Sequence, residues 1–301
     1  MKNIQWVLLL SMVLAWNACE QDQFFELTNP PEFPWLNVGE LERGIVTPYN
    51  IAFLSSWDNY FGNTDLISDC MSDLVYLIPN TSADIPYNEM YFRTTDVEIN
   101  KANSIFSNAY KAIGACNSVI AFLDENNDEP YTNMTKEDKL NIRRIKGEAF
   151  FMRAYSYFHT VRIHGPAPGN PAFSSEKRLP LRVIFPTSYT EANEPEFVSA
   201  EQIYELIIDD LIQSMELLPE GFDPLVHHAS YAHGRANRYA AAALLSRVYF
   251  LLSKFDLALP MLDYVISGPY RLDQDPIEAF NKNDESQGHE VIWYALYYDK
   301  A

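Results

Sequence analysis

The chain has 301 residues, of which 48% are hydrophobic and 14% aromatic, so it can bury a large core and is not disordered as a whole. Its 22 Lys and Arg residues stand against 41 Asp and Glu, which gives a formal net charge of −19. This charge argues against nucleic acid as a partner, because phosphates are neutralised by Lys and Arg. It also argues against electrostatic capture by an anionic membrane.

An export signal is predicted over residues 1–18. Lys2 is the lone charge there, and residues 4–16 are almost entirely apolar. That length suits the hydrophobic region of a secretory signal and is too short for a membrane-spanning helix. Cys19 then either remains an ordinary cysteine after cleavage nearby, or becomes the lipidated first residue of a bacterial lipoprotein. We favour lipidation, because Cys19 stands where the hydrophobic region ends.

Residues 19–37 are predicted to form a lipid-anchored tether, and residues 38–301 a helical domain. The tether contains Pro30, Pro31 and Pro34, which cannot continue a helix and hold the chain extended. No later apolar run reaches the length of about 18 residues that a membrane-spanning helix requires.

Two cysteines, Cys70 and Cys116, follow the signal. An exported protein could join them in a disulfide. Cys116 also lies on an apolar helical stripe, so a buried free thiol is the alternative.

Helices are predicted from apolar side chains that recur every three or four residues, from a run that is apolar nearly all round, and from residues that start or stop a helix. They cover residues 98–125, 135–164, 199–218, 237–252 and 256–268. The fourth is apolar nearly all round, which is typical of a helix buried on every side. The chain is therefore predicted to be mainly α.

The predicted helix ends follow from local chemistry. Thr135 with Asp138, and Ser199 with Gln202, have the spacing of a capping box. Gly165 is expected to end the second helix. Asp96 and Asp256 would cap the first and the fifth.

The last two predicted helices also fit a degenerate tetratricopeptide register, with Leu245, Tyr249, Ala258 and Leu262 at the matching positions. The alternative is an ordinary helical hairpin. Residues 290–298 are rich in β-formers and are predicted to form a strand.

No catalytic signature is present: the sequence lacks a glycine fingerprint, a P-loop, a nucleophile elbow and a Cys-x-x-Cys pair. We therefore predict neither an enzyme nor a bound cofactor. His227, His228 and His233 could hold a metal, but loop histidines are usually solvated. The acidic residues 124–129 could attract calcium, but they lack the EF-hand spacing. No metal site is predicted at either place.

Residues 55–93 are predicted to be a loop region in which aromatic and polar residues alternate without a clean period. Aromatic faces stack on sugar rings, and Asp and Asn side chains bond sugar hydroxyls. Trp57, Asp58, Asn59 and Tyr60 form the tightest such cluster and are the predicted ligand-binding residues. The alternative is that these rings pack beneath a long loop.

Several segments carry patterns that occur together in one family. They are Gly147–Phe158 with Val161, Arg162, Gly165 and Pro168; Tyr110–Ile120; Gly234–Asn237 with Ala242–Tyr249; and Glu290–Trp293. Taken together, in their order along the chain, they resemble the SusD/RagB family of outer-membrane nutrient-binding lipoproteins of the Bacteroidota. The resemblance covers roughly residues 40–298.

The resemblance implies a fold of tetratricopeptide-like helical pairs with long irregular loops and little strand. It implies a non-catalytic lipoprotein, anchored in the outer membrane and facing the cell exterior. Such a protein captures an oligosaccharide or similar nutrient oligomer and delivers it to a SusC-like TonB-dependent transporter. Family members usually run longer, so we also expect the C-terminal part of the family fold to be missing.

A second hypothesis is a helical adaptor or truncated remnant, which would bind proteins and no sugar. An exported hydrolase is a third, since a dispersed pair of carboxylates could cleave glycosides.

Overall fold

The computed structural model describes residues 35–53, 60–72, 75–76, 91–93, 100–186, 188, 191, 193–223, 225, 227–228, 230–275, 277 and 289–294. The chain divides into two units, residues 36–185 with 195–301 and residues 1–35 with 186–194. In the smaller unit, the amide of Glu191 donates to the hydroxyl of Ser188 at 3.2 Å. All elements named below belong to the larger unit.

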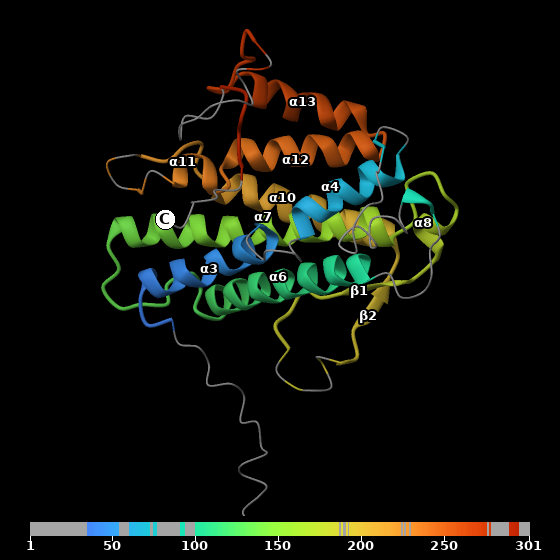
Figure 1. The fold of residues 1–301 in the computed structure, drawn as a ribbon. Helices are drawn as coiled ribbons and strands as arrows, with labels where there is room; N and C mark the ends of the chain where they lie inside the picture. The colour runs from blue at the N-terminus through green and yellow to red at the C-terminus, as the bar shows by residue number, and fades with distance from the viewer. Residues whose placement is uncertain are drawn as a thin grey trace, which may run out of the picture. The chain divides into compact units, whose positions relative to one another are not determined.

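The larger unit is built from helices. They are α3 (Val38–Phe53), α4 (Tyr60–Met71), α6 (Asn100–Glu125), α7 (Lys136–His164), α8 (Ala172–Ser175), α10 (Ala200–Leu217), α11 (Tyr231–Gly234), α12 (Arg238–Leu251) and α13 (Phe255–Ile266). The long helices stack in the order α6, α7, α10, α12, α13, and α3 and α4 pack against α6 and α7 (Figure 1). No helix in the part of the chain that the structure describes has both the length and the hydrophobicity needed to span a bilayer.

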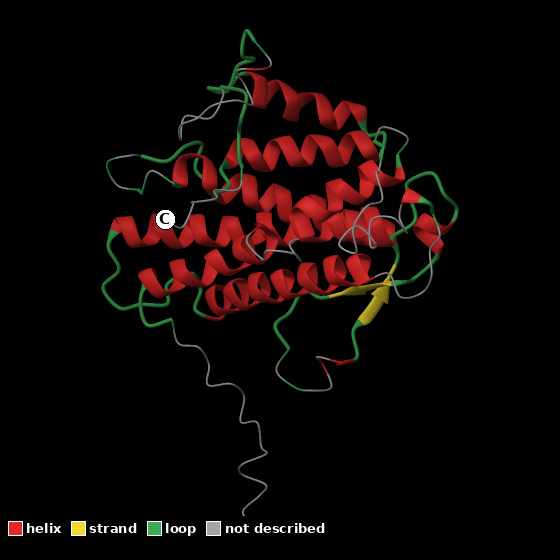
Figure 2. Cartoon of the chain, in the orientation of Figure 1, coloured by secondary structure: helices red, strands yellow, loops and turns green. Residues whose placement is uncertain are grey.

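The strands are short. β1 (Leu179–Leu181) and β2 (Glu196–Val198) pair antiparallel, with Leu179 opposite Val198 (Figure 2). The prediction of a mainly α fold with little strand is confirmed.

Helix α7 forms the centre of the core. Every residue from Gly147 to Val161 is buried, which covers most of the segment that carries the family pattern. Gly147 allows α10 to approach closely, because a Cβ built there would lie 2.9 Å from the Cβ of Leu217. The dense aromatic pattern of this helix therefore serves packing on all sides.

A buried ion pair connects three of these helices. The guanidinium of Arg153 on α7 donates Nε to Oδ2 of Asp210 on α10 at 2.8 Å and a terminal nitrogen to Oδ1 at 2.7 Å. Its other terminal nitrogen donates to Oδ1 of Asn117 on α6 at 2.9 Å. Asp210 and Arg153 are both almost fully buried.

The predicted helix ends agree closely with the structure. Thr135 and Ser199 each form a complete capping box with the residue three positions on. Gly165 ends α7, and its amide donates to the carbonyl of Val161. Asn237 caps α12 by accepting from the amide of Ala240.

Three local predictions are wrong. Residues 60–71 form α4 within the stretch predicted to be a loop, and α3 was not predicted at all. Asp256 lies inside the first turn of α13, whose N-cap position is Lys254 without a side-chain bond. Residues 290–294 form a turn and irregular backbone in place of the predicted strand, while residues 295–298 lie outside the described part.

The cysteines Cys70 and Cys116 are free thiols and both are buried. A disulfide between them is therefore ruled out, and the prediction of a buried free thiol at Cys116 is confirmed. Burial raises the pKa of both thiols, so each stays protonated and unreactive at neutral pH.

Candidate functional site

The predicted ligand-binding residues fall at the edge of what the structure describes. Trp57, Asp58 and Asn59 lie outside the described residues, as does the predicted lipidation site Cys19. Tyr60 is the first residue of α4, and its side chain is not described. The sugar site at these positions therefore stays a prediction.

The described residues contain an aromatic cluster around Trp293. Its indole lies edge-to-face against four rings, with centroid distances of 5.0 Å to 6.2 Å. Two of the rings come from α3 and two from α7: Tyr49, Phe53, Phe151 and Tyr155. The indole Nε1 also donates to the carbonyl of Gly234 at 3.4 Å. These contacts pack the segment that follows α13 against α3 and α7.

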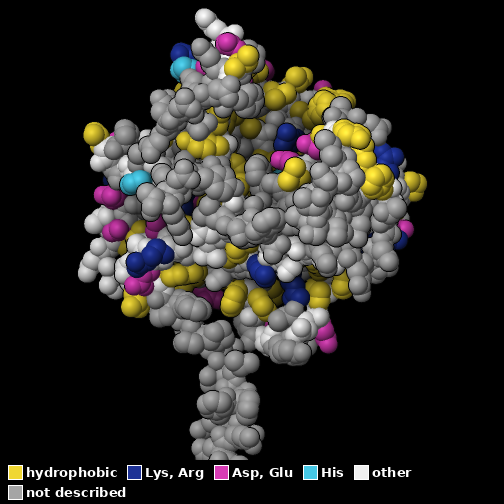
Figure 3. Space-filling view, in the orientation of Figure 1, with side chains coloured by type: hydrophobic (Ala, Val, Ile, Leu, Met, Phe, Trp, Pro, Cys, Tyr) yellow, Lys and Arg dark blue, Asp and Glu magenta, His cyan; other side chains and the backbone are white. Residues whose placement is uncertain are grey.

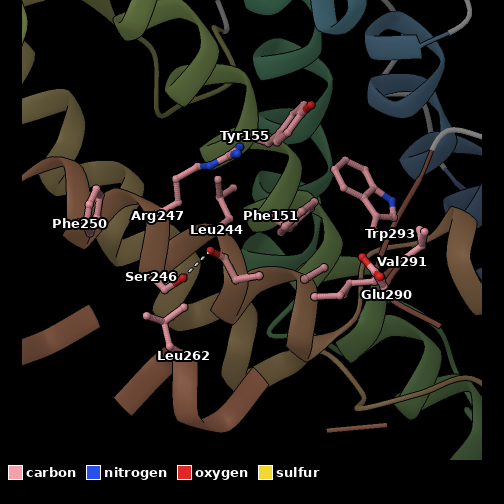
Figure 4. A pocket seen from close by; sticks show the side chains of 13 residues that line it. Phe151, Tyr155, Leu244, Ser246, Arg247, Phe250, Leu262, Glu290, Val291 and Trp293 are labelled. Carbon is pink, nitrogen blue, oxygen red and sulfur yellow. Dashed lines mark hydrogen bonds between the residues drawn. The ribbon is translucent and has the colours of Figure 1, made fainter. Parts of the chain in front are cut away.

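A cavity of about 690 Å³ lies beside this cluster. Phe151, Tyr155 and Trp293 line one part of it, and Leu244 of α12 and Leu262 of α13 line another (Figure 4). Its volume is within the range of small-molecule sites. Its lining is mostly apolar.

The polar groups of this cavity are few and mostly occupied. The hydroxyl of Ser246 donates to the carbonyl of Ala243 at 2.8 Å, and Glu290 Oε1 accepts from the amide of Asp273 at 2.7 Å. Arg247 forms no hydrogen bond or ion pair with any other residue that the structure describes. A sugar brings many hydroxyls that would lose water here without gaining partners. The cavity therefore suits apolar side chains accompanied by one anionic group better than it suits a glycan.

A second cluster contains two acids and two bases. Glu148 accepts from Arg144 at 2.5 Å and pairs with Arg235 at 2.8 Å, and Glu42 pairs with both arginines. The hydroxyl of Tyr49 donates to Glu148 at 2.9 Å. Burial alone would raise the pKa of Glu42, but the two guanidiniums outweigh it and hold that pKa below its usual range. The cluster joins α3, α7 and the residue that follows α11. Because its charges balance, it leaves no unmatched charge for a ligand.

Several other titratable groups singled out from the sequence have protein partners. His227 Nδ1 lies 3.3 Å from the carbonyl of Asp223, and His228 Nδ1 lies 2.8 Å from the hydroxyl of Ser230. No group of three possible metal ligands was found within the described ranges, from which the side chain of His233 is absent. In the acidic segment, Asp124 and Asp128 both pair with Lys146, at 2.6 Å and 2.7 Å.

Sequence reasoning did not locate the cavity. Its walls come from α7, α12, α13 and residues 290–293, which are distant in the chain. One signal was available, since Trp293 ends a segment of the family pattern. Its position among four rings depends on tertiary packing, which local spacing does not encode.

Comparisons with known proteins agree on one family. A family model described as "Starch-binding associating with outer membrane", SusD-like, matches residues 65–250, more than half of the chain. The SusD-like protein P2 of Formosa agariphila is 26% identical over 174 residues, which are 57% of this chain and 28% of that protein.

Solved structures show the same fold. A SusD-like carbohydrate-binding protein of Bacteroides vulgatus has a TM-score of 0.67 at 20% identity, covering 85% of this chain and 50% of that one. A second SusD superfamily protein of Bacteroides vulgatus has a TM-score of 0.68 at 18% identity, covering 87% and 50%. A laminarin-binding SusD-like protein has a TM-score of 0.58 at 21% identity, covering 79% and 45%. The chain thus spans about half the length of these solved relatives, and less of the curated one.

Proposed function

Because this chain belongs to the SusD-like family of starch-binding proteins that associate with the outer membrane, we propose that it binds carbohydrate at the cell surface without cleaving it. The match of the family model over residues 65–250 carries this proposal. The laminarin-binding relative of the same fold supports a polysaccharide ligand. The absence of catalytic motifs from the sequence fits binding without catalysis.

The proposed sugar contacts are Trp57, Asp58, Asn59 and Tyr60. A ring can stack on the apolar face of a sugar while the neighbouring carboxylate and amide bond its hydroxyls. In the cavity beside Trp293, the side chains of Ser246 and Glu290 already bond the backbone, so we place the glycan at residues 57–60. We assign no sugar to that cavity.

The proposed setting is the outer membrane. Lipidation of Cys19 would anchor the chain there, facing the cell exterior, and residues 20–37 would give it reach. From this position the protein would pass its oligosaccharide to a SusC-like TonB-dependent transporter. The experiment is to express Cys19→Ser in a host that processes bacterial lipoproteins and to follow the protein by membrane fractionation. The proposed anchor requires the variant to leave the membrane fraction; retention there would contradict it.

Glycan binding is tested by titration calorimetry of the chain against laminarin, starch and mannan. One stacked ring contributes on the order of 1 kcal/mol, so Trp57→Ala or Tyr60→Ala should weaken binding about fivefold. Phe197→Ala is the matched control, because it removes an exposed ring on β2. The site is rejected if Trp57→Ala weakens binding no more than Phe197→Ala does. The function is rejected if no glycan binds.

A further inference from the structure

A second pocket, of about 210 Å³, lies beside α8 and is separate from the cavity at Trp293. Its walls come from the loop after α7, from α8, from the first turns of α10 and from the turn between α12 and α13. They include the rings of Phe173 and Tyr204, whose centroids lie 5.7 Å apart. These rings meet because α8 packs against α10 (Figure 1). We call this space the α8 pocket.

Local chemistry holds the walls of the α8 pocket in place. The capping box at Ser199 fixes the first turn of α10. Gly169 has a φ of 88°, which glycine adopts without strain, and lets the chain turn between α7 and α8. The side chain of Asn170 accepts from the amide of Ala172 at 2.9 Å, and its carbonyl accepts from the amide of Phe173 at 2.9 Å. A ligand can therefore bind here without first ordering these segments.

One wall of the α8 pocket contributes a polar group without a protein partner. Tyr204 is only 3% exposed, and within the described part of the chain no residue forms a hydrogen bond with its hydroxyl. Burial raises the pKa of Tyr204 to about 12, so the hydroxyl stays protonated at neutral pH and can donate. Buried hydroxyls nearly always have a partner, so this one indicates a ligand or water in the pocket.

The rim of the α8 pocket is charged. Glu201 and Glu205 stand at i and i+4 on α10, and Lys254 comes from the turn before α13. All three are exposed, and none forms an ion pair with another residue in the described ranges. Where α12 and α13 lie, by contrast, Figure 3 shows hydrophobic side chains, in yellow, gathered together. The α8 pocket thus combines two aromatic rings with unpaired charged groups.

These groups favour a neutral ligand that carries several hydroxyls. An anionic ligand would meet the two glutamates, and a cationic ligand would meet Lys254, so each would face a like charge. Sugar hydroxyls can donate to the carboxylates and accept from Lys254 and Tyr204. The volume is below the range of drug-sized sites, which limits the occupant to about one sugar ring.

We propose that the α8 pocket binds a single sugar ring, as a second carbohydrate contact made by residues other than 57–60. Glu201 and Glu205 accept from the hydroxyls of this ring, and Lys254 and Tyr204 donate to it. Phe173 covers its apolar face. The inference rests on the proposed carbohydrate-binding function and adds a second place at which the sugar is held.

The test is a titration of the full chain with D-glucose, D-mannose and D-galactose, followed by ligand-observed NMR. It uses the Trp57→Ala variant, so that a sugar held at residues 57–60 does not mask the pocket. At least one monosaccharide should bind. Adding Tyr204→Phe should weaken this binding about fivefold because one hydrogen bond is lost, and adding Phe173→Leu should weaken it about fivefold because a stacked ring is lost.

The matched control is Tyr264→Phe in the same background, which removes a hydroxyl that bonds Glu220 outside the pocket. It should leave the affinity unchanged, and circular dichroism of each variant checks that the helices persist. The proposal is overturned if no monosaccharide binds, or if Tyr204→Phe and Phe173→Leu bind as tightly as Tyr264→Phe. Calorimetry of the unaltered chain with laminarin, starch and mannan separates the two failures: polysaccharide binding would reject the pocket alone, and its absence would reject the proposed function as well.

Discussion

The buried pair Arg153–Asp210 gives the sharpest prediction about stability. Replacing Asp210 by Ala would leave the guanidinium of Arg153 buried with Asn117 as its main partner. Removing one partner of a buried pair costs about 3–5 kcal/mol, because the remaining charge is uncompensated. Arg153→Met together with Asp210→Leu removes both charges and should recover most of that loss.

The measurement is the free energy of unfolding from urea titrations followed by circular dichroism. The control is Glu129→Ala, which breaks an ion pair with Lys139 whose side chains are 63% and 52% exposed. Exposed pairs contribute at most about 1 kcal/mol. The reasoning is refuted if Asp210→Ala costs no more than Glu129→Ala, or if the double variant is as unstable as the single one.

Three further predictions concern packing, pH and a cap. Gly147→Ala should lower stability by about 1–3 kcal/mol, because its Cβ would crowd Leu217 of α10. Gly114→Ala should raise stability by up to about 1 kcal/mol, because the added Cβ would meet nothing within 4 Å beyond its chain neighbours and its own helix backbone. Melting curves that show equal effects would contradict this. Burial lowers the pKa of His159 to about 3, so the unfolded chain takes up the proton first and stability falls as pH drops from about 6.5 towards 3. His159→Leu should reduce the pH slope of the unfolding free energy there by up to about 1.4 kcal/mol per pH unit, and an unchanged slope would count against the assignment. Ser199→Ala removes a buried cap and should cost about 1 kcal/mol in urea titrations; no measurable loss would mean that the capping box is not formed in solution.

The helix ends were predictable because their chemistry is local. The boxes at Thr135 and Ser199 need only residues three positions apart, and Gly165 ends α7 through its own amide. The apolar period of α6 and α10 was equally clear. All of these features depend on residues that are close together in the sequence.

The failures have a common cause in tertiary structure. Residues 290–294 have β-forming side chains, but Trp293 is held by four rings from α3 and α7, and this packing overrides the strand propensity. The pairing of Arg153 with Asp210 joins residues on different helices. No spacing in the sequence indicates such a pair.

The candidate sites likewise separate into one that the local sequence shows and others that depend on tertiary packing. A cluster such as Trp57–Tyr60 is visible from sequence because its members are adjacent. The cavity beside Trp293 and the α8 pocket depend on segments that meet only in the fold. Exposure in particular cannot be inferred from pattern, since the period of α13 would equally suit a buried helix, yet Ala258 is its only buried residue.

The central claim is that this chain binds carbohydrate, and thermal unfolding with and without soluble polysaccharides tests it most directly. A ligand that binds only the native state raises the melting temperature, and a concentration 100 times the Kd adds about 2.7 kcal/mol. The account predicts one cooperative loss of helical signal, shifted upwards by laminarin or another glycan of the panel and shifted less in Trp57→Ala. A cooperative transition that no glycan moves would contradict it.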